Sequence, residues 1–240
     1  MADANFMKQK IQVILIIGMV LAGIRLAWIF YERHENSATA AKQEAPMLDP
    51  DFYVHPKKIF PYDLKSAKAE LMKQPAWVKV GYAYPYFPYN SATRSSNLAR
   101  EAGKLLPIQK LEIKDVLTAQ SAKHPSERQI LGVFAQDGKS FATPVGTETQ
   151  GNFSFWINDM LFLQDPHQLY NRWPAEVWQA IDQHQVKPGM SELQADFAVG
   201  IGLLLSDSSS DRTLNYPNGG KPITITFQNG KAVEIKPGPA

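Results

Sequence analysis

The apolar stretch IQVILIIGMVLAGIRLAWIFY at residues 11–31 decides how the rest of the chain is placed. At about 1.5 Å of rise per residue, a helix of this length spans roughly 31 Å, the thickness of the hydrocarbon core of a bilayer. Arg25 lies about one turn from the midpoint, where its side chain can extend toward the membrane surface. Trp28 and Tyr31 fall near one end, as interface anchors do. The stretch therefore predicts a transmembrane helix.

A cleavable signal peptide is the alternative, because Lys8 and Lys10 precede the stretch and the small residues 38–40 follow it. The apolar run is longer than the roughly 7–15 residues of a signal peptide, and charged residues stand before the candidate cleavage site. We therefore expect a single-pass protein of the inner (cytoplasmic) membrane. Residues 1–10 form its cytoplasmic tail, and the C-terminal domains lie outside the cytoplasm. Basic residues are equally frequent on both sides, so this orientation rests on the short tail alone.

Composition narrows the classes of function. The net charge is +2, with 25 basic and 23 acidic residues interspersed, so the chain lacks the basic stripe of a nucleic-acid-binding protein. The chain has no cysteine, which excludes disulfides, thiolate metal sites and cysteine nucleophiles. We expect a polar, then proline-rich linker at residues 32–62, followed by two small domains.

The first of these domains, residues 63–163, has the pattern of short antiparallel strands. Apolar residues alternate with charged ones in KLEIKDV at residues 110–116, and a second strand pattern follows at 130–134. Asp137-Gly138 is a strong hairpin signal. We predict a small antiparallel β-barrel, and the order of strands loosely resembles an SH3-like barrel at the level of fold alone.

The segment YAYPYFPY at residues 82–89 has the most unusual composition in the chain. Its rings interleave with prolines and belong to Tyr82, Tyr84, Tyr86, Phe87 and Tyr89. One interpretation is a platform that binds a glycan or a proline-rich peptide, because tyrosines offer large contact areas at low entropic cost. The other is that the rings cover one end of the barrel.

The second domain, residues 164–240, begins with helical patterns. Ser191 and Gln194 form a capping box, and Leu193, Phe197 and Ile201 recur at four-residue spacing. Three strands follow, RTLNY, KPITITF and KAVEI, joined at glycine-containing turns. The predicted fold class is therefore α+β: a transmembrane helix, a barrel, and a domain of two helices and a three-stranded sheet.

The segments VKPGMSELQADFAVGIG and ITITFQNGKAVEI carry a resemblance to a known family. Their matching positions are Pro188, Gly189, Met190, Phe227, Asn229, Gly230 and Val233. Residues 175–236 thereby resemble the SmpA/OmlA domain of small outer-membrane-assembly lipoproteins. The resemblance implies a cell-envelope (periplasm) domain that binds other proteins through exposed surfaces. The lipidated cysteine of that family is absent here, and the expected membrane helix stands in its place, which favours inner-membrane partners.

No catalytic motif emerges from the sequence. HExxH, GxSxG and a phosphate-binding glycine loop are all missing, so we expect no enzyme, no cofactor and no metal site. The predicted function is a membrane-anchored, non-catalytic scaffold or assembly partner, with the bilayer and other envelope proteins as its partners. A ligand-binding module using the aromatic segment is the alternative. An enzyme is the third hypothesis, and it requires Asp159, Asp165 and His167 to converge in one deep pocket.

Overall fold

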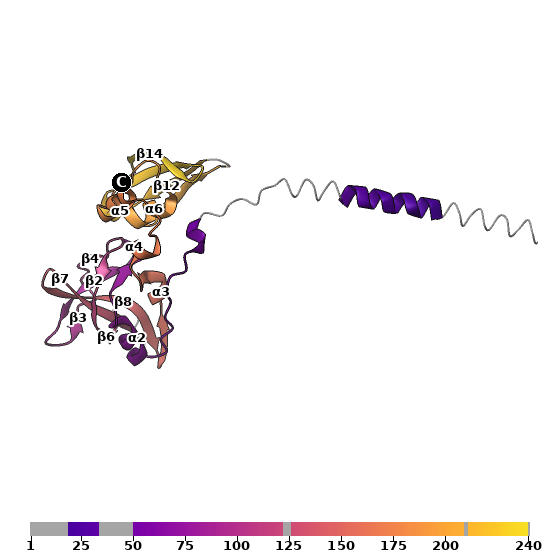
Figure 1. The fold of residues 1–240 in the computed structure, drawn as a ribbon. Coiled ribbons are helices and arrows are strands. Elements are labelled where there is room, and N and C mark those ends of the chain that lie inside the picture. The colour runs from indigo at the N-terminus through magenta and orange to yellow at the C-terminus, as the bar shows by residue number, and fades with distance from the viewer. Residues whose placement is uncertain (1–18, 34–49, 122–125, 209–210, 240) are drawn as a thin grey trace, which may run out of the picture. The chain divides into compact units, whose positions relative to one another are not determined.

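The computed structural model describes residues 19–33, 50–121, 126–208 and 211–239 (Figure 1). The chain divides into two compact units, residues 1–53 and residues 54–240. The first unit contains a helix at residues 19–33 and the short 3₁₀ helix η1 (Pro50–Tyr53). The second unit contains all of the sheets.

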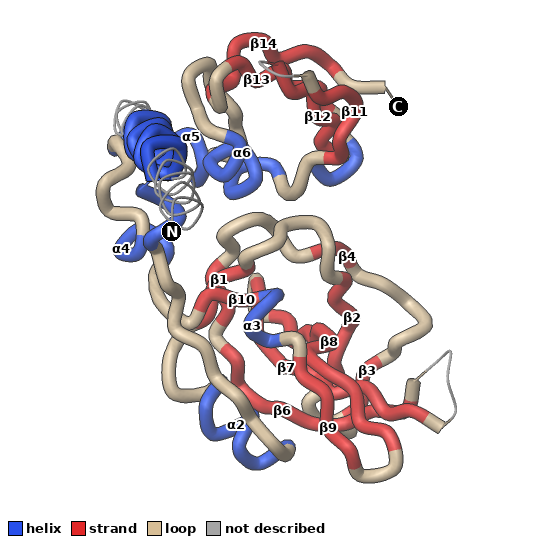
Figure 2. The backbone as a smooth tube through the Cα atoms, turned by 90° about the vertical axis from the view of Figure 1, so that its right-hand side faces the viewer, coloured by secondary structure: helices blue, strands red, loops and turns tan. Residues whose placement is uncertain are grey.

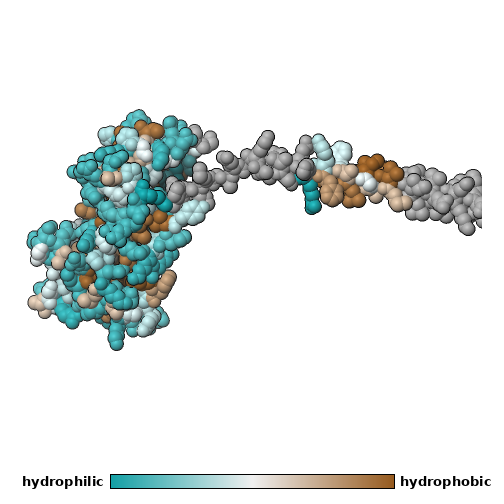
Figure 3. Space-filling model, viewed as in Figure 1, coloured by the Kyte–Doolittle hydropathy of each residue, from teal (hydrophilic) through white to brown (hydrophobic). Residues whose placement is uncertain are grey.

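The predicted transmembrane helix is wrong. None of the helices in the described ranges is long and apolar enough to cross a membrane. The described helical residues 19–33 include Arg25 and two charged residues, Glu32 and Arg33, at their end. Residues 11–18 of the predicted span lie outside the described residues. The single-pass topology and the inner-membrane location are therefore wrong as well. Trp28 and Tyr31 are exposed on this helix, where apolar side chains are visible in Figure 3.

The predicted fold class also fails beyond the membrane helix, because the described residues are mostly β and form three sheets with short helices. The largest sheet has the order β3-β2-β8-β7-β6, with β4 beside β2 and β9 beside β8. Its strands are β2 (Pro85–Asn90), β3 (Ser95–Ser96), β4 (Gly103–Lys104), β6 (Ile113–Gln120), β7 (Glu127–Gln136), β8 (Lys139–Thr149) and β9 (Asn152–Phe155).

The hairpin signal at Asp137-Gly138 is confirmed, because these two residues join β7 to β8. Both have positive φ angles, 50° and 74°, as a tight turn between twisted strands requires.

A small sheet packs beside the large one, in the order β10-β1-β5. Its strands are β1 (Ala76–Val78), β5 (Lys110–Leu111) and β10 (Leu161–Phe162), accompanied by helices α2 (Leu64–Leu71) and α3 (Ile157–Met160). Asp63 caps α2 by accepting a hydrogen bond from the Ser66 N–H at 2.7 Å. The α2 face with Ala67 and Leu71 is buried in the core of this half.

The C-terminal half carries a four-stranded antiparallel sheet, not the predicted three-stranded one. Its order is β11-β12-β13-β14. The helices and strands of this half are α4 (Pro166–Leu169), α5 (Ala175–Asp182), α6 (Glu192–Val199), β11 (Leu203–Asp207), β12 (Asp211–Tyr216), η2 (Asn218–Gly220), β13 (Ile223–Gln228) and β14 (Lys231–Pro237). Helices α5 and α6 lie against one face of this sheet, as Figures 1 and 2 show.

The start of α6 follows the predicted pattern and its end does not. The capping box is confirmed, since the Ser191 hydroxyl accepts from the Gln194 N–H and the Gln194 side chain accepts from the Ser191 N–H. The helix stops at Val199 because Gly200 has a φ of 85°. Ile201 therefore leaves the helix, and the chain turns into the additional strand β11.

One aromatic core joins the two halves of the second unit. Phe162, at the end of β10, lies 5.5 Å from the Phe197 ring of α6 and 6.4 Å from Tyr170 between ring centroids. Trp173 and Trp178 complete the same cluster. Because these rings come from both halves and are buried together, residues 54–240 have a shared core.

Candidate functional site

Strand β2 separates the predicted aromatic residues onto two faces. Tyr84 and Tyr86 point into the core of the first half, where the Tyr86 ring meets Phe141 edge to face at 5.0 Å. Tyr89 packs on the other side against a small cluster around Leu131, and Phe87 pairs with Ala142 of strand β8. Successive side chains of a strand point to opposite faces, so these rings do not form one platform.

Tyr82 lies apart from the other rings, in a left-handed backbone conformation with a φ of 60°. Its N–H donates to the Leu105 carbonyl at 2.7 Å. Its ring rests against two glycines of the C-terminal half: a Cβ on Gly219 would come within 2.7 Å of the ring and one on Gly200 within 3.2 Å. Burial raises the pKa of the Tyr82 hydroxyl. Glycine is thus needed at positions 200 and 219, where the Tyr82 ring packs against the C-terminal half.

A groove of about 680 Å³ runs beside Tyr82 between the two halves of the second unit. Tyr82 and Tyr86 line it, so it contains two of the five predicted ligand-binding aromatics. Lys104 and Asn218 add polar groups, and Ile201 lies at the side that leads to β11. The groove has the size and mixed lining of a site for a small ligand or a peptide side chain.

Strand β11 forms an open, apolar edge of the four-stranded sheet. All five of its residues are exposed, and Leu203, Leu204 and Leu205 have exposed fractions of 58%, 53% and 56%. Within the described residues, no strand pairs with its outer side. Leu204 lies opposite Leu214 of β12, which is buried, so the apolar side of the sheet continues to the open edge. Exposed apolar edge strands are templates for pairing with another chain.

The opposite edge of the same sheet is protected. Strand β14 presents Lys231, Glu234 and Lys236, and it ends at Pro237. The segment before α6 covers part of it: the Gly189 N–H donates to the Ala232 carbonyl at 2.8 Å. Charges, proline and covering segments are common means of preventing unwanted strand pairing. The contrast leaves β11 as the more apolar of the two edges, although β11 carries a bulge between Leu204 and Ser206.

Sequence reasoning missed β11 because its signal is ambiguous. Three consecutive leucines after Gly202 lack the period-two alternation of a half-buried strand. The open edge itself could not have been found without the order of the strands.

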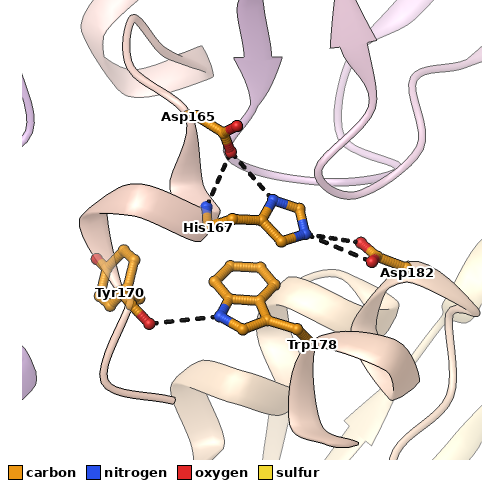
Figure 4. A network of polar contacts seen from close by, with 5 residues as sticks. All are labelled: Asp165, His167, Tyr170, Trp178 and Asp182. Carbon is orange, nitrogen blue, oxygen red and sulfur yellow. Dashed lines mark hydrogen bonds and ion pairs between the residues drawn. The ribbon is translucent and has the colours of Figure 1, made fainter. Parts of the chain in front are cut away.

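His167 is held between two carboxylates, as Figure 4 shows. Its Nδ1 lies 3.0 Å from Asp165 Oδ1, and its Nε2 lies 3.2 Å from Asp182 Oδ1. The ring stacks on Trp178 with centroids 4.1 Å apart. When the ring is protonated, both nitrogens donate, so the network ties α4 to α5.

The enzyme hypothesis gains nothing from this network. Asp159, on α3, is exposed and stands near Tyr84, where its charge adds to burial in raising the pKa of that hydroxyl. It is absent from the polar network around His167 that the structure describes. Among the described residues, no group of three histidine, aspartate or glutamate side chains could hold a metal ion.

A buried acid lies under the start of β11. Asp196 Oδ1 and the Tyr216 hydroxyl are both buried, and the two side chains interact with each other. Burial, followed by the charge of Glu192, raises the pKa of Asp196 to about 7. Burial also raises the pKa of Tyr216. Neither the helical pattern nor a motif in the sequence distinguishes Asp196 from a surface residue.

Comparison with known proteins gives no relative, because no family model, curated protein or solved structure matches this chain. The resemblances to SmpA/OmlA domains and SH3-like barrels therefore stay predictions.

Proposed function

We propose that this chain is a non-catalytic scaffold or assembly partner, which binds proteins by adding a strand at the open edge of β11. The proposal rests on the contrast between the two edges of one sheet, because β11 presents leucines whereas β14 presents charged residues. The resemblance of residues 175–236 to a family that binds other proteins agrees with this proposal.

Strand addition at β11 would supply both backbone and side-chain energy. An added strand pairs with the N–H and C=O groups on the outer side of β11. Full burial of one leucine contributes about 1.5–3 kcal/mol, so covering a leucine that is half exposed contributes roughly 1 kcal/mol. Leu203, Leu204 and Leu205 together then contribute about 3 kcal/mol, before the cost of association.

Affinity purification of the full chain after mild crosslinking tests this proposal. The variant Leu204→Lys places a charge in the proposed interface, and Val233→Lys is its control, because Val233 is also half exposed but lies on β14. We expect crosslinked species with the wild-type chain and with Val233→Lys, and their loss with Leu204→Lys. If the same species form with all three chains, or if none forms, the proposed role of β11 is wrong.

A ligand-binding module is the second candidate, and the groove favours it. Tyr82 and Tyr86 both line this space, so a glycan or a proline-rich peptide would contact these two rings and not the whole aromatic segment. Isothermal titration with glycan and proline-rich peptide sets tests the proposal on wild type, Tyr82→Leu and the control Tyr89→Leu. Binding lost only in Tyr82→Leu, with an unchanged circular dichroism spectrum, would support it. No binding to wild type would refute it for these ligands.

A further inference from the structure

We propose that residues 57–65, the strap that leads into α2, form a second binding surface, which takes an acidic peptide segment of a partner protein. The surface consists of Lys57, Lys58, Phe60, Tyr62 and Lys65, and we call it the lysine–aromatic patch. This inference does not rest on β11, so the two proposals can fail independently.

Two aromatic rings of the patch point away from the protein. Phe60 and Tyr62 have exposed fractions of 82% and 81%, the highest among the exposed large apolar side chains of the described residues. Ile59 is only 8% exposed and belongs to the core of the first half. Alternate residues of an extended segment point to opposite sides, so the burial of Ile59 directs both rings outward. The two rings form an apolar surface that a partner can cover.

The backbone of the strap is fixed by side chains of the first half. The Ile59 N–H donates to Asn158 Oδ1 at 3.0 Å, and Asn158 Nδ2 donates to the Ile59 carbonyl at 2.7 Å. The Lys57 N–H donates to Gln164 Oε1 at 2.9 Å. Pro61, between the two rings, has no N–H for strand pairing. Side chains on an ordered backbone therefore make the contacts, and binding does not require the strap to become ordered.

Charge indicates the chemistry of the partner. Lys57, Lys58 and Lys65 are exposed, and they flank the two rings on both sides. Three lysines and one aspartate give the strap a net charge of +2. That aspartate, Asp63, is already engaged as the cap of α2. A partner that places carboxylates around an apolar segment complements this arrangement.

The fixed geometry of the patch favours a protein over other anionic partners. Two rings held two residues apart can match apolar side chains at a fixed spacing, whereas a lipid surface offers no fixed spacing to match. The strap has no arginine, and three lysines neutralise few phosphates of a nucleic acid. Aromatic residues at the centre of an interface, by contrast, contribute much of the affinity between proteins.

Fluorescence anisotropy of the full chain with labelled peptides tests the inference. Three peptides share the same length and the same two leucines, and their remaining residues are glutamate, serine or lysine. We expect the glutamate peptide to bind most tightly, with an affinity that falls as salt is raised. The combined variant Phe60→Ser and Tyr62→Ser should lose about tenfold or more of this affinity, because it removes both rings. The combined variant Lys57→Glu and Lys58→Glu should lose the preference for glutamate over lysine.

Matched changes elsewhere on the surface are the controls. Tyr31→Ser removes an exposed ring outside the patch. The combined variant Lys221→Glu and Lys231→Glu makes the same change of charge at exposed positions of the C-terminal half. Both controls should bind the glutamate peptide as tightly as wild type. All of these variants should keep the wild-type circular dichroism spectrum, because the replaced side chains are exposed.

The inference is overturned if the wild-type chain binds the three peptides equally or not at all, or if removal of both rings leaves the affinity unchanged. It is also overturned if binding that depends on the rings appears only with vesicles of phosphatidylcholine and phosphatidylserine, or only with single-stranded DNA. Leu204→Lys separates the patch from β11, since the glutamate peptide should bind this variant as tightly as wild type. Peptide binding without Leu204-dependent crosslinks keeps the patch and refutes the role of β11, and the reverse result keeps β11 and refutes the patch.

Discussion

Replacement of Asp196 by asparagine is expected to stabilise the protein at neutral pH. Asp196 Oδ1 is buried, and burial raises the pKa of the carboxyl to about 7, although Tyr216 and the Gly202 backbone oppose the shift. In the unfolded chain, the same group has a pKa near its ordinary value of 3.8. Asparagine has a similar shape and never ionises, so the variant removes the cost of a buried charge.

The sign and size of the effect follow from the two pKa values. The folded protein binds the Asp196 proton more tightly than the unfolded chain, so this group's favourable contribution is fully present below pH 3.8. It is lost as the pH rises to about 7 and is constant above that. A separation of about three pH units, at 1.36 kcal/mol each, gives about 4 kcal/mol. Because the side chain keeps some exposure, we expect about 2–4 kcal/mol.

Urea unfolding between about pH 4.5 and about pH 8 measures this contribution. The free energy of unfolding of wild type should fall relative to that of Asp196→Asn across this range, because the difference removes the contributions of all other groups. Asp159→Asn is the control, since Asp159 is exposed and this variant makes the same substitution at the surface. If the Asp196→Asn and wild-type profiles are parallel, Asp196 is ionised in the folded protein, and our reasoning about its burial is wrong.

Three further changes test how the second unit is held together. Gly200→Ala should lower the free energy of unfolding by about 2–4 kcal/mol, because Gly200 has a φ of 85° and a Cβ there would meet the Gly81 carbonyl at 2.8 Å. Gly189→Ala is the control: Gly189 has a φ of 88° but open space around it, so the loss should be only about 1 kcal/mol. His167→Ala should cost about 1–2 kcal/mol through the lost stacking on Trp178 and the lost polar contacts with Asp165 and Asp182. Leu214→Ala, in the core under β11, should cost about 2–5 kcal/mol.

Chemical denaturation in urea measures all of these changes. Equal losses for Gly200→Ala and Gly189→Ala would show that the contact with Gly81 adds nothing. An unchanged free energy of unfolding in His167→Ala would mean that the network of Figure 4 is not stabilising. A loss below about 1 kcal/mol for Leu214→Ala would contradict its place in the core.

Local features of the fold could be predicted where a few neighbouring residues determine the backbone. The Asp137-Gly138 hairpin and the capping box at Ser191 each depend on hydrogen bonds or φ angles within four residues. Such features need no tertiary contact, so the sequence alone identifies them.

Other features depend on tertiary packing. The spacing of Leu193, Phe197 and Ile201 favours a longer α6, but Gly200 ends the helix where its backbone approaches Gly81. The apolar composition of residues 11–31 predicts a membrane span, whereas none of the helices in the described ranges is long and apolar enough to cross a membrane.

The candidate site was predictable only in part. Of the five aromatic residues predicted to bind a ligand, Tyr82 and Tyr86 line the groove. The other rings lie elsewhere, because the alternation along β2 and the core on both of its faces decide where they point. The proposed binding edge at β11 depends on the strand order and on the contrast with β14, and neither is a property of a short segment.

Amide hydrogen exchange of the full chain, alone and in the crosslinked species, tests the central claim most directly. The amides of β11 that point away from β12 should exchange quickly in the chain alone and become protected in the crosslinked species, while those of β14 stay unchanged. In Leu204→Lys, this protection should be absent. If exchange across residues 203–207 is the same with and without crosslinked partners, then β11 is not a binding edge.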